Sequence, residues 1–140
     1  MYIFGDNDPY YTDANRVAFR LFGAYMCGFY EARKNIYRDQ KMNILNGYPS
    51  ACMKPHIIMT NINCLFEGDT TSEIIDKNNE LEPVLYGSAG NLTVAVYDKN
   101  GKRAVMDTGL TRMLNENYLR FEGVDRYIKN ATTFLAHLDN

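Results

Sequence analysis

Two short polar loops carry the side chains best suited to chemistry in this sequence. Gly5–Asp8 follows the apolar run Tyr2–Phe4, and Asp107–Gly109 follows the apolar segment Arg103–Met106. An apolar run that stops at a polar turn is typical of a buried strand. If the two strands run parallel, both loops lie at one edge of the sheet, where open α/β sheets bind ligands. Their carboxylates would then converge on a hydroxyl-rich ligand or a hard cation.

The same residue types also have a purely structural use, and the sequence leaves both explanations open. Asp and Asn side chains cap turns and helix starts without any ligand. The loop Gly87–Asn91 could cradle a phosphate with its backbone N–H groups, but no Lys-Ser/Thr pair follows it, which favours a turn. Arg112 could bind an anion or form a surface salt bridge. The candidate ligand-binding residues are Asp6, Asn7, Asp8, Ser88, Asp107, Thr108, Thr111 and Arg112.

The cysteines and histidines offer no recognisable catalytic or metal site. Three cysteines and two histidines occur without the spacing of a zinc site. Cys64 and His56 could form a nucleophile and a base, but a buried structural cysteine is the favoured explanation. We therefore predict no catalytic residue, no metal and no cofactor.

Composition limits the class of protein. The chain has 140 residues, of which 46% are hydrophobic, and we expect one α/β domain spanning residues 1–140. A net charge of −2 gives no basic excess for nucleic acid. No apolar run approaches the roughly 20 residues that a membrane span needs. An odd number of cysteines without a CxxC pair or a signal peptide predicts a cytoplasmic location.

Hydrophobic periodicity predicts helices packed on a mixed sheet. The last third of the chain is the clearest part, because Asp98–Gly101 joins two strands as a hairpin turn. We expect a strand or strand approach at 56–59 and a polar surface loop over 69–82 with one helical turn or strand at Ile74–Ile75. The remaining expected elements are strands at 2–4, 83–86, 92–97 and 103–106, a helix over 14–22 and a helix over 121–138.

Several of these segments resemble class I glutamine amidotransferase-like domains. The segments are Gly5–Tyr10, His56–Ile58, Leu65–Gly68, Tyr86–Ser88, Arg103–Gly109 and Gly123–Ala131. The resemblance implies a flavodoxin-like α/β fold. It also implies βα units before Tyr2, so we expect either a domain trimmed at its N-terminus or another chain that supplies the missing neighbour in the sheet.

The nucleophile of that family is absent from the sequence. True amidotransferases carry a cysteine on a strand-to-helix elbow flanked by glycines. Neither Cys27 nor Cys52 stands in such an elbow. The resemblance therefore points to a domain without amidotransferase catalysis.

Our leading hypothesis is a non-catalytic binding or assembly module with a possible small polar ligand. A strand of central type invites pairing when it is left at an edge, so we expect a homo-oligomer or a partner chain that completes the sheet. The alternative is a small hydrolase or sugar-directed enzyme in which Asp6, Asp8 and Asp107 do acid–base work or hold a metal. A third hypothesis is a fragment of a multidomain protein.

Overall fold

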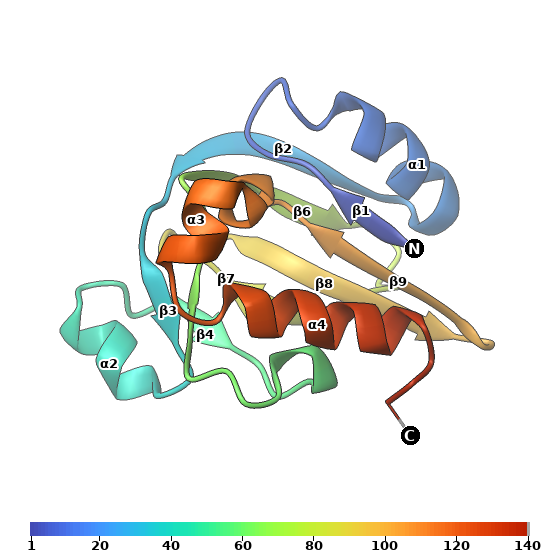
Figure 1. Cartoon of the computed structure of the whole chain (residues 1–140). Coiled ribbons are helices and arrows are strands. Elements are labelled where there is room, and N and C mark those ends of the chain that lie inside the picture. Colours follow the sequence, from blue (N-terminus) through green and yellow to red (C-terminus); the bar gives the residue numbers. More distant parts are fainter. Residues whose placement is uncertain (140) are drawn as a thin grey trace.

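A five-stranded mixed sheet forms the centre of the structure, a computed structural model that describes residues 1–139 (Figure 1). Its strand order is β1-β9-β8-β7-β4. The one parallel pair joins β1 to β9, and the other neighbours are antiparallel. The strands are β1 (Tyr2–Phe4), β9 (Lys102–Asp107), β8 (Leu92–Lys99), β7 (Glu82–Tyr86) and β4 (Cys52–Met53). The predicted α/β class with a mixed sheet is confirmed.

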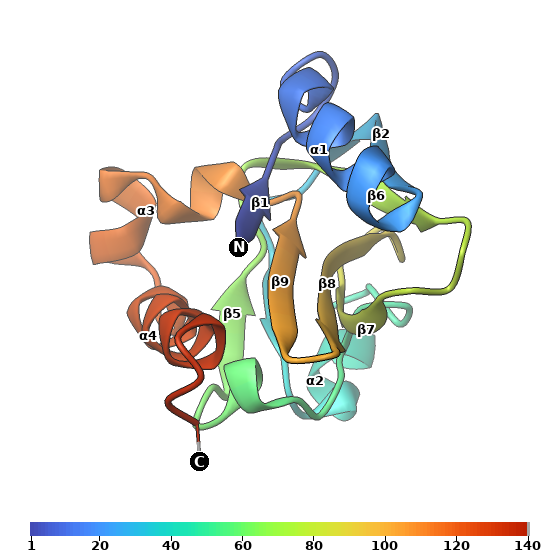
Figure 2. The same ribbon diagram turned by 90° about the vertical axis from the view of Figure 1, so that its right-hand side faces the viewer.

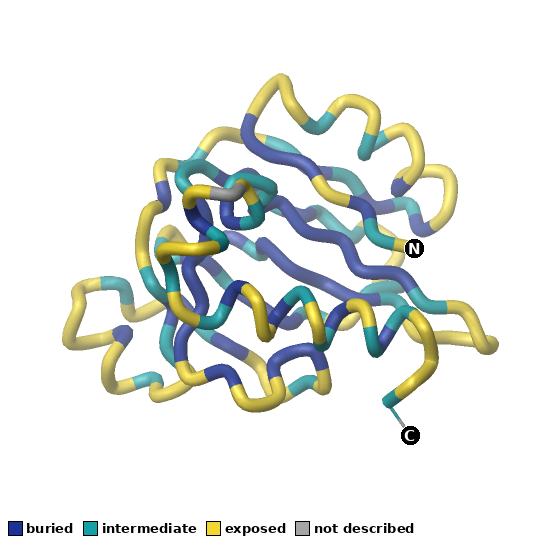
Figure 3. The backbone as a smooth tube through the Cα atoms, viewed as in Figure 1, coloured by how far each residue is buried: buried dark blue, intermediate teal, exposed yellow. Residues whose placement is uncertain are grey.

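Side chains of the β8–β9 hairpin contribute to the hydrophobic clusters on both faces of the sheet. Its turn places Asn100 and Gly101 at positive φ, as the tight hairpin turn predicted from the sequence requires. Because side chains alternate along a strand, Val96 and Val105 face one side while Ala95 and Ala104 face the other. Figure 3 shows that these central strands are buried along most of their length.

One helix covers each face of the sheet (Figures 1 and 2). Helix α1 (Thr12–Phe22) packs Ala18 and Phe22 into the cluster that contains Ile3. Helix α4 (Val124–Leu135) packs Tyr127, Ala131 and Phe134 into the larger cluster on the opposite face. The result is a three-layer arrangement in which β1 is an edge strand with a helix on either side.

The remaining segments form smaller elements around this centre. Strand β2 (Ala24–Glu31) pairs with β6 (Thr70–Asp76), and β3 (Asn35–Tyr37) pairs with β5 (Cys64–Phe66). The short helices are α2 (Gln40–Leu45), α3 (Asn115–Arg120), η1 (Ile57–Met59) and η2 (Leu110–Met113). No helix within residues 1–139 is long and apolar enough to cross a membrane.

Two expectations about secondary structure were wrong, and a third was right only in part. The segment expected as a strand at 56–59 is the helical turn η1, where the His56 Nδ1 accepts a hydrogen bond from the backbone N–H of Ile58. Of the two options expected at Ile74–Ile75, the strand is present, but as β6 it extends over Thr70–Asp76 and buries the polar residues Thr71 and Ser72, so this part of the segment is not a surface loop. The C-terminal helix spans Val124–Leu135 instead of 121–138, because Gly123 starts it in a left-handed conformation.

Gly123 gives a stability prediction with a matched control. Gly123 and Gly47 both have φ of +89°, but a Cβ at position 123 would lie 2.1 Å from the Cys64 carbonyl oxygen, whereas position 47 is open. Gly47→Ala should cost about 1–2 kcal/mol, from backbone conformation alone. Gly123→Ala should cost about 1–3 kcal/mol more, because backbone must move to admit the Cβ. Urea unfolding of both variants measures the difference, and equal costs would contradict the proposed clash.

Candidate functional site

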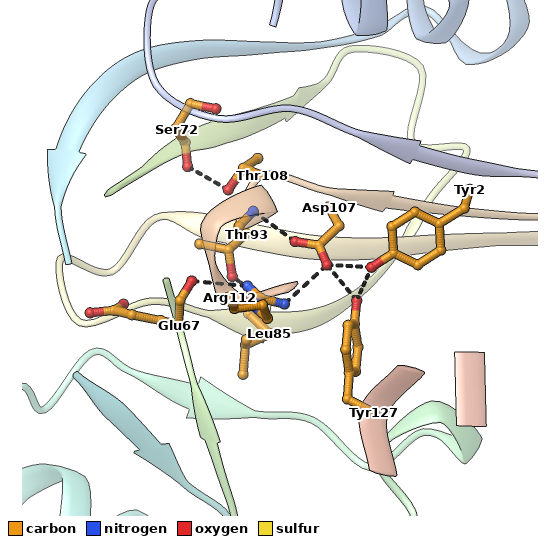
Figure 4. Close-up of polar contacts among 10 residues, drawn as sticks. Tyr2, Glu67, Ser72, Leu85, Thr93, Asp107, Thr108, Arg112 and Tyr127 are labelled. Carbon is orange, nitrogen blue, oxygen red and sulfur yellow. Dashed lines mark hydrogen bonds and ion pairs between the residues drawn. The ribbon is translucent and has the colours of Figure 1, made fainter. Parts of the chain in front are cut away.

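Asp107, the last residue of β9, is fully buried and lies at the centre of a polar cluster in which Tyr2 alone is partly exposed (Figure 4). Its Oδ2 accepts hydrogen bonds from the Tyr2 hydroxyl at 2.5 Å, the Tyr127 hydroxyl at 2.7 Å and the Arg112 Nη1 at 3.0 Å. Its Oδ1 accepts from the Gly109 backbone N–H at 2.7 Å. We call Asp107, Arg112, Tyr2 and Tyr127 the Asp107 cluster.

Arg112 supplies the positive charge of the Asp107 cluster. Its side chain in η2 is completely buried, and its Nη2 donates to the backbone carbonyl of Glu67 at 3.1 Å. Burial has the largest single effect and alone would lower the pKa of Arg112, but the acidic groups around it, with Asp107 first among them, together outweigh burial and raise the pKa above its ordinary value. The two residues therefore form a buried ion pair, and the expectation of a surface salt bridge for Arg112 was wrong.

The two tyrosines act as hydrogen-bond donors. Their hydroxyl oxygens lie 2.9 Å apart, and both point at Asp107. Burial, reinforced by the negative charge of Asp107, raises the pKa of Tyr2 and of Tyr127 well above the ordinary tyrosine value. Both hydroxyls therefore keep their protons and donate to the carboxylate. This arrangement suits a structural anchor better than a general base, which needs access to a substrate proton.

Glu67, just after β5, organises a second buried contact. It accepts hydrogen bonds from the Ser88 hydroxyl at 2.6 Å, the Ser88 backbone N–H at 2.8 Å and the Lys34 backbone N–H at 3.2 Å. The N–H and hydroxyl of Ser88, which a phosphate-cradling loop would present to its ligand, are thus directed at a carboxylate of the same chain.

Hydrogen bonds within the chain also hold the loop Gly5–Asp8, which follows β1. The Asp6 Oδ1 accepts from the Thr70 hydroxyl and from the backbone N–H of Asn7, each at 2.8 Å. Burial raises the pKa of Asp6, although these two hydrogen bonds oppose the shift. The Asn7 side chain donates to the Asp8 carbonyl, and Asp8 itself is exposed.

The structure brings the two predicted loops together but turns their carboxylates toward different partners. Because β1 and β9 are parallel neighbours, both loops lie at the same edge, and the Gly5 N–H donates to the Asp107 carbonyl at 2.9 Å. The Asp107 side chain then meets residues of β1, η2 and α4, whereas Asp6 meets Thr70 in β6.

The other candidate residues on the second loop also bond within the chain. The Thr108 hydroxyl donates to the Ser72 carbonyl at 3.1 Å, and the Thr111 hydroxyl accepts from the Asp69 N–H at 2.8 Å. Turn and loop capping therefore accounts for most of the candidate set. Within residues 1–139, no three His, Cys, Asp or Glu side chains gather in a way that could hold a metal ion.

Two apolar depressions flank the free edge of β1. One, of about 610 Å³, lies between β1 and α4 and is lined by Tyr2, Phe4, Met113, Ile128 and Leu135 among others. The other, of about 280 Å³, lies between β1 and α1 and includes Met1, Ile3, Asp13, Ala14 and Val17. We call them the α4 groove and the α1 groove. Neither groove was predicted from the sequence, because each is formed by segments that lie far apart in the chain.

Comparison with known proteins adds no relative: no family model, no curated protein and no solved structure matches this chain.

Removing the charge of Asp107 should destabilise the protein strongly. Asp107→Asn leaves Arg112 buried without a counter-ion, which costs about 3–5 kcal/mol. Tyr127→Phe removes one hydroxyl and leaves the ion pair, so about 1–3 kcal/mol is expected. Denaturant unfolding followed by circular dichroism measures both. An Asp107→Asn variant as stable as the wild type would show that the ion pair does not anchor the fold.

Ionisation of Asp6 should lower the free energy of unfolding. Its effect on stability therefore has the opposite pH dependence from that of a carboxylate whose pKa is lowered by folding. Because its pKa is raised in the folded chain, its contribution to stability is fully present below the unfolded pKa. It is lost as pH rises through the folded pKa. Asp6→Asn keeps an oxygen acceptor for Thr70 and Asn7. The variant should therefore equal or exceed wild-type stability at pH 7 and lose that advantage in acid.

Unfolding curves from about pH 3 to 7 test this, with Asp8→Asn controlling for the loss of one negative charge in the same loop. A variant that loses more stability at pH 7 than in acid would show that the ionised Asp6 is required for folding.

Proposed function

We propose that this protein is a non-catalytic binding or assembly module whose partner chain completes the sheet at β1. The proposal includes an amidotransferase-like, flavodoxin-like fold and a cytoplasmic location. Three free thiols, on Cys27, Cys52 and Cys64, support a reducing compartment. The observation that carries the proposal is the open, apolar second edge of β1.

The backbone of β1 has unused hydrogen-bonding groups on that edge. The Met1 carbonyl accepts from Val105, and the Gly5 N–H donates to Asp107, so Met1, Ile3 and Gly5 direct their backbone toward β9. Alternate residues of a strand bond to opposite neighbours, so Tyr2 and Phe4 direct theirs away from the sheet. Among residues 1–139, no strand pairs with this side of β1.

The side chains around the edge are apolar and incompletely covered. Phe4 is 50% exposed, Met1 58% and Val17 41%. Apolar surface next to free strand-pairing groups is the combination that a sheet edge normally avoids unless a partner covers it. The edge therefore has both the hydrogen-bonding groups and the hydrophobic surface of an interface.

The enzyme alternative has less support. It needs carboxylates that can reach a substrate, yet Asp107 is buried and accepts four hydrogen bonds from its own chain. Asp6 is held by Thr70 and Asn7, while Asp8 projects into solvent.

The proposal predicts that the purified protein forms a stable complex through the β1 edge. In multi-angle light scattering we expect a mass above that of the 16.1 kDa chain, decreasing on dilution. Phe4→Lys should shift the population toward monomer, because it places a charge in the apolar interface. Phe29→Lys changes a similarly exposed phenylalanine, on β2, and should leave the mass unchanged. A well-folded monomer at every concentration, with no partner from its natural source bound at β1, would refute the proposal.

A further inference from the structure

We infer that the partner at β1 is a second copy of this chain, paired antiparallel across a two-fold axis that passes between the two Ile3 residues. The inference rests on the proposed function and adds the identity, direction and register of the partner strand. It would join two five-stranded sheets into one continuous sheet of ten strands.

The register follows from which backbone groups are free. Only Tyr2 and Phe4 present both an N–H and a C=O to the open edge within β1. If Tyr2 of one copy lies opposite Phe4 of the other, the two strands exchange four hydrogen bonds. A register centred on Tyr2 or on Phe4 pairs only one of these residues inside the strand and forms fewer bonds. The pairing with the most hydrogen bonds therefore places Ile3 opposite Ile3 of the second copy.

This pairing also fills the α4 groove. Tyr2 and Phe4 point to the α4 face, where their ring centroids lie 6.1 Å apart. Side chains of paired residues project from the same face of a sheet, so Phe4 of the second copy would lie beside Tyr2 at the groove. The groove wall that α4 contributes, Ile128, Thr132 and Leu135, carries no charge. The half-exposed Phe4 thus has an apolar site in an identical molecule.

Charges on α1 favour a second copy over an unrelated apolar strand. Asp13, Val17 and Arg20 are spaced four and three residues apart, so they form one stripe along α1, and Asp13 and Val17 line the groove beside β1. A two-fold axis perpendicular to the sheet makes the two α1 helices antiparallel. When Val17 of one copy faces Val17 of the other, Asp13 of each copy faces Arg20 of the other copy. Arg20 is exposed and forms no ion pair within residues 1–139, while Asp13 has only a solvent-exposed pair with Arg16 at 3.5 Å, so the stripe is complementary to itself.

Disulfide trapping tests the register. In the proposed pairing the two Ile3 residues form a non-hydrogen-bonded pair with Cα atoms about 4.5 Å apart, within disulfide range. Ile3→Cys should therefore yield a covalent dimer under mild oxidation, and mass spectrometry should identify two copies of the N-terminal peptide linked through position 3. Phe4→Cys is the matched control: its two copies are offset by two residues along the strands, beyond the about 7 Å that a disulfide spans.

The outcomes separate this inference from the proposed function. Cross-linking through position 3 but not position 4 supports the register. Cross-linking through position 4 alone, or through neither position in a protein that still assembles through β1, overturns the inference and leaves the binding module intact. A wild-type protein that is monomeric at every concentration and binds no other chain refutes both.

A charge exchange on exposed α1 residues tests the geometry without disturbing the core. Asp13→Arg and Arg20→Asp each place like charges opposite one another at two points in the dimer, and each should weaken self-association by about fivefold. Combining them restores opposite charges and should recover wild-type affinity. Sedimentation equilibrium measures the dissociation constants. Single variants with unchanged affinity, or a double variant weaker than either single one, would overturn the antiparallel placement of α1.

Discussion

Asp107 and Arg112 form an ion pair that is wholly removed from water, and the arrangement of the surrounding segments depends on keeping it satisfied. A buried charge is tolerable only when it is paired and its remaining hydrogen-bonding positions are filled. The tyrosine hydroxyls of β1 and α4 fill those positions on the carboxylate, and the Glu67 carbonyl accepts from the guanidinium, whose buried Nε alone has no hydrogen-bond partner within residues 1–139. Segments far apart in the sequence are therefore fixed to one point at the carboxyl end of β9.

The same point explains why the two polar loops are neighbours without forming an open acidic pocket. Parallel pairing of β1 with β9 brings the loops to one edge of the sheet. The ion pair then draws Asp107 inward, while the Thr70 hydroxyl holds Asp6 against β6. What remains accessible along β1 is backbone and apolar side chain, which is why we propose a binding edge there and no catalytic centre.

The sequence predicted the parts of the fold that are encoded locally. The hairpin at Asn100 and Gly101 and the apolar face of α1 follow from turn chemistry and from helical spacing, and both are present. Strand β6 was expected only at Ile74–Ile75, as one of two options, because its remaining buried residues include Thr71 and Ser72, whose polarity suggested a surface. The partners of Asp107 were missed because Tyr2 and Tyr127 are 125 residues apart, and hydrogen bonding between them depends on tertiary packing. The abundance of tyrosine without tryptophan was the one available signal, since buried tyrosine hydroxyls need partners.

Tyr2 is part of both the Asp107 cluster and the edge strand β1. Its hydroxyl is part of the buried cluster around Asp107, while its backbone forms the open border of the sheet. Whatever binds that border holds Tyr2 in the position that the cluster needs, and a ligand that prefers the folded state raises its stability by mass action. Occupancy of the edge and integrity of the core are therefore thermodynamically linked, and if the occupant is a second copy of this chain, as we propose, the melting temperature depends on the protein's own concentration.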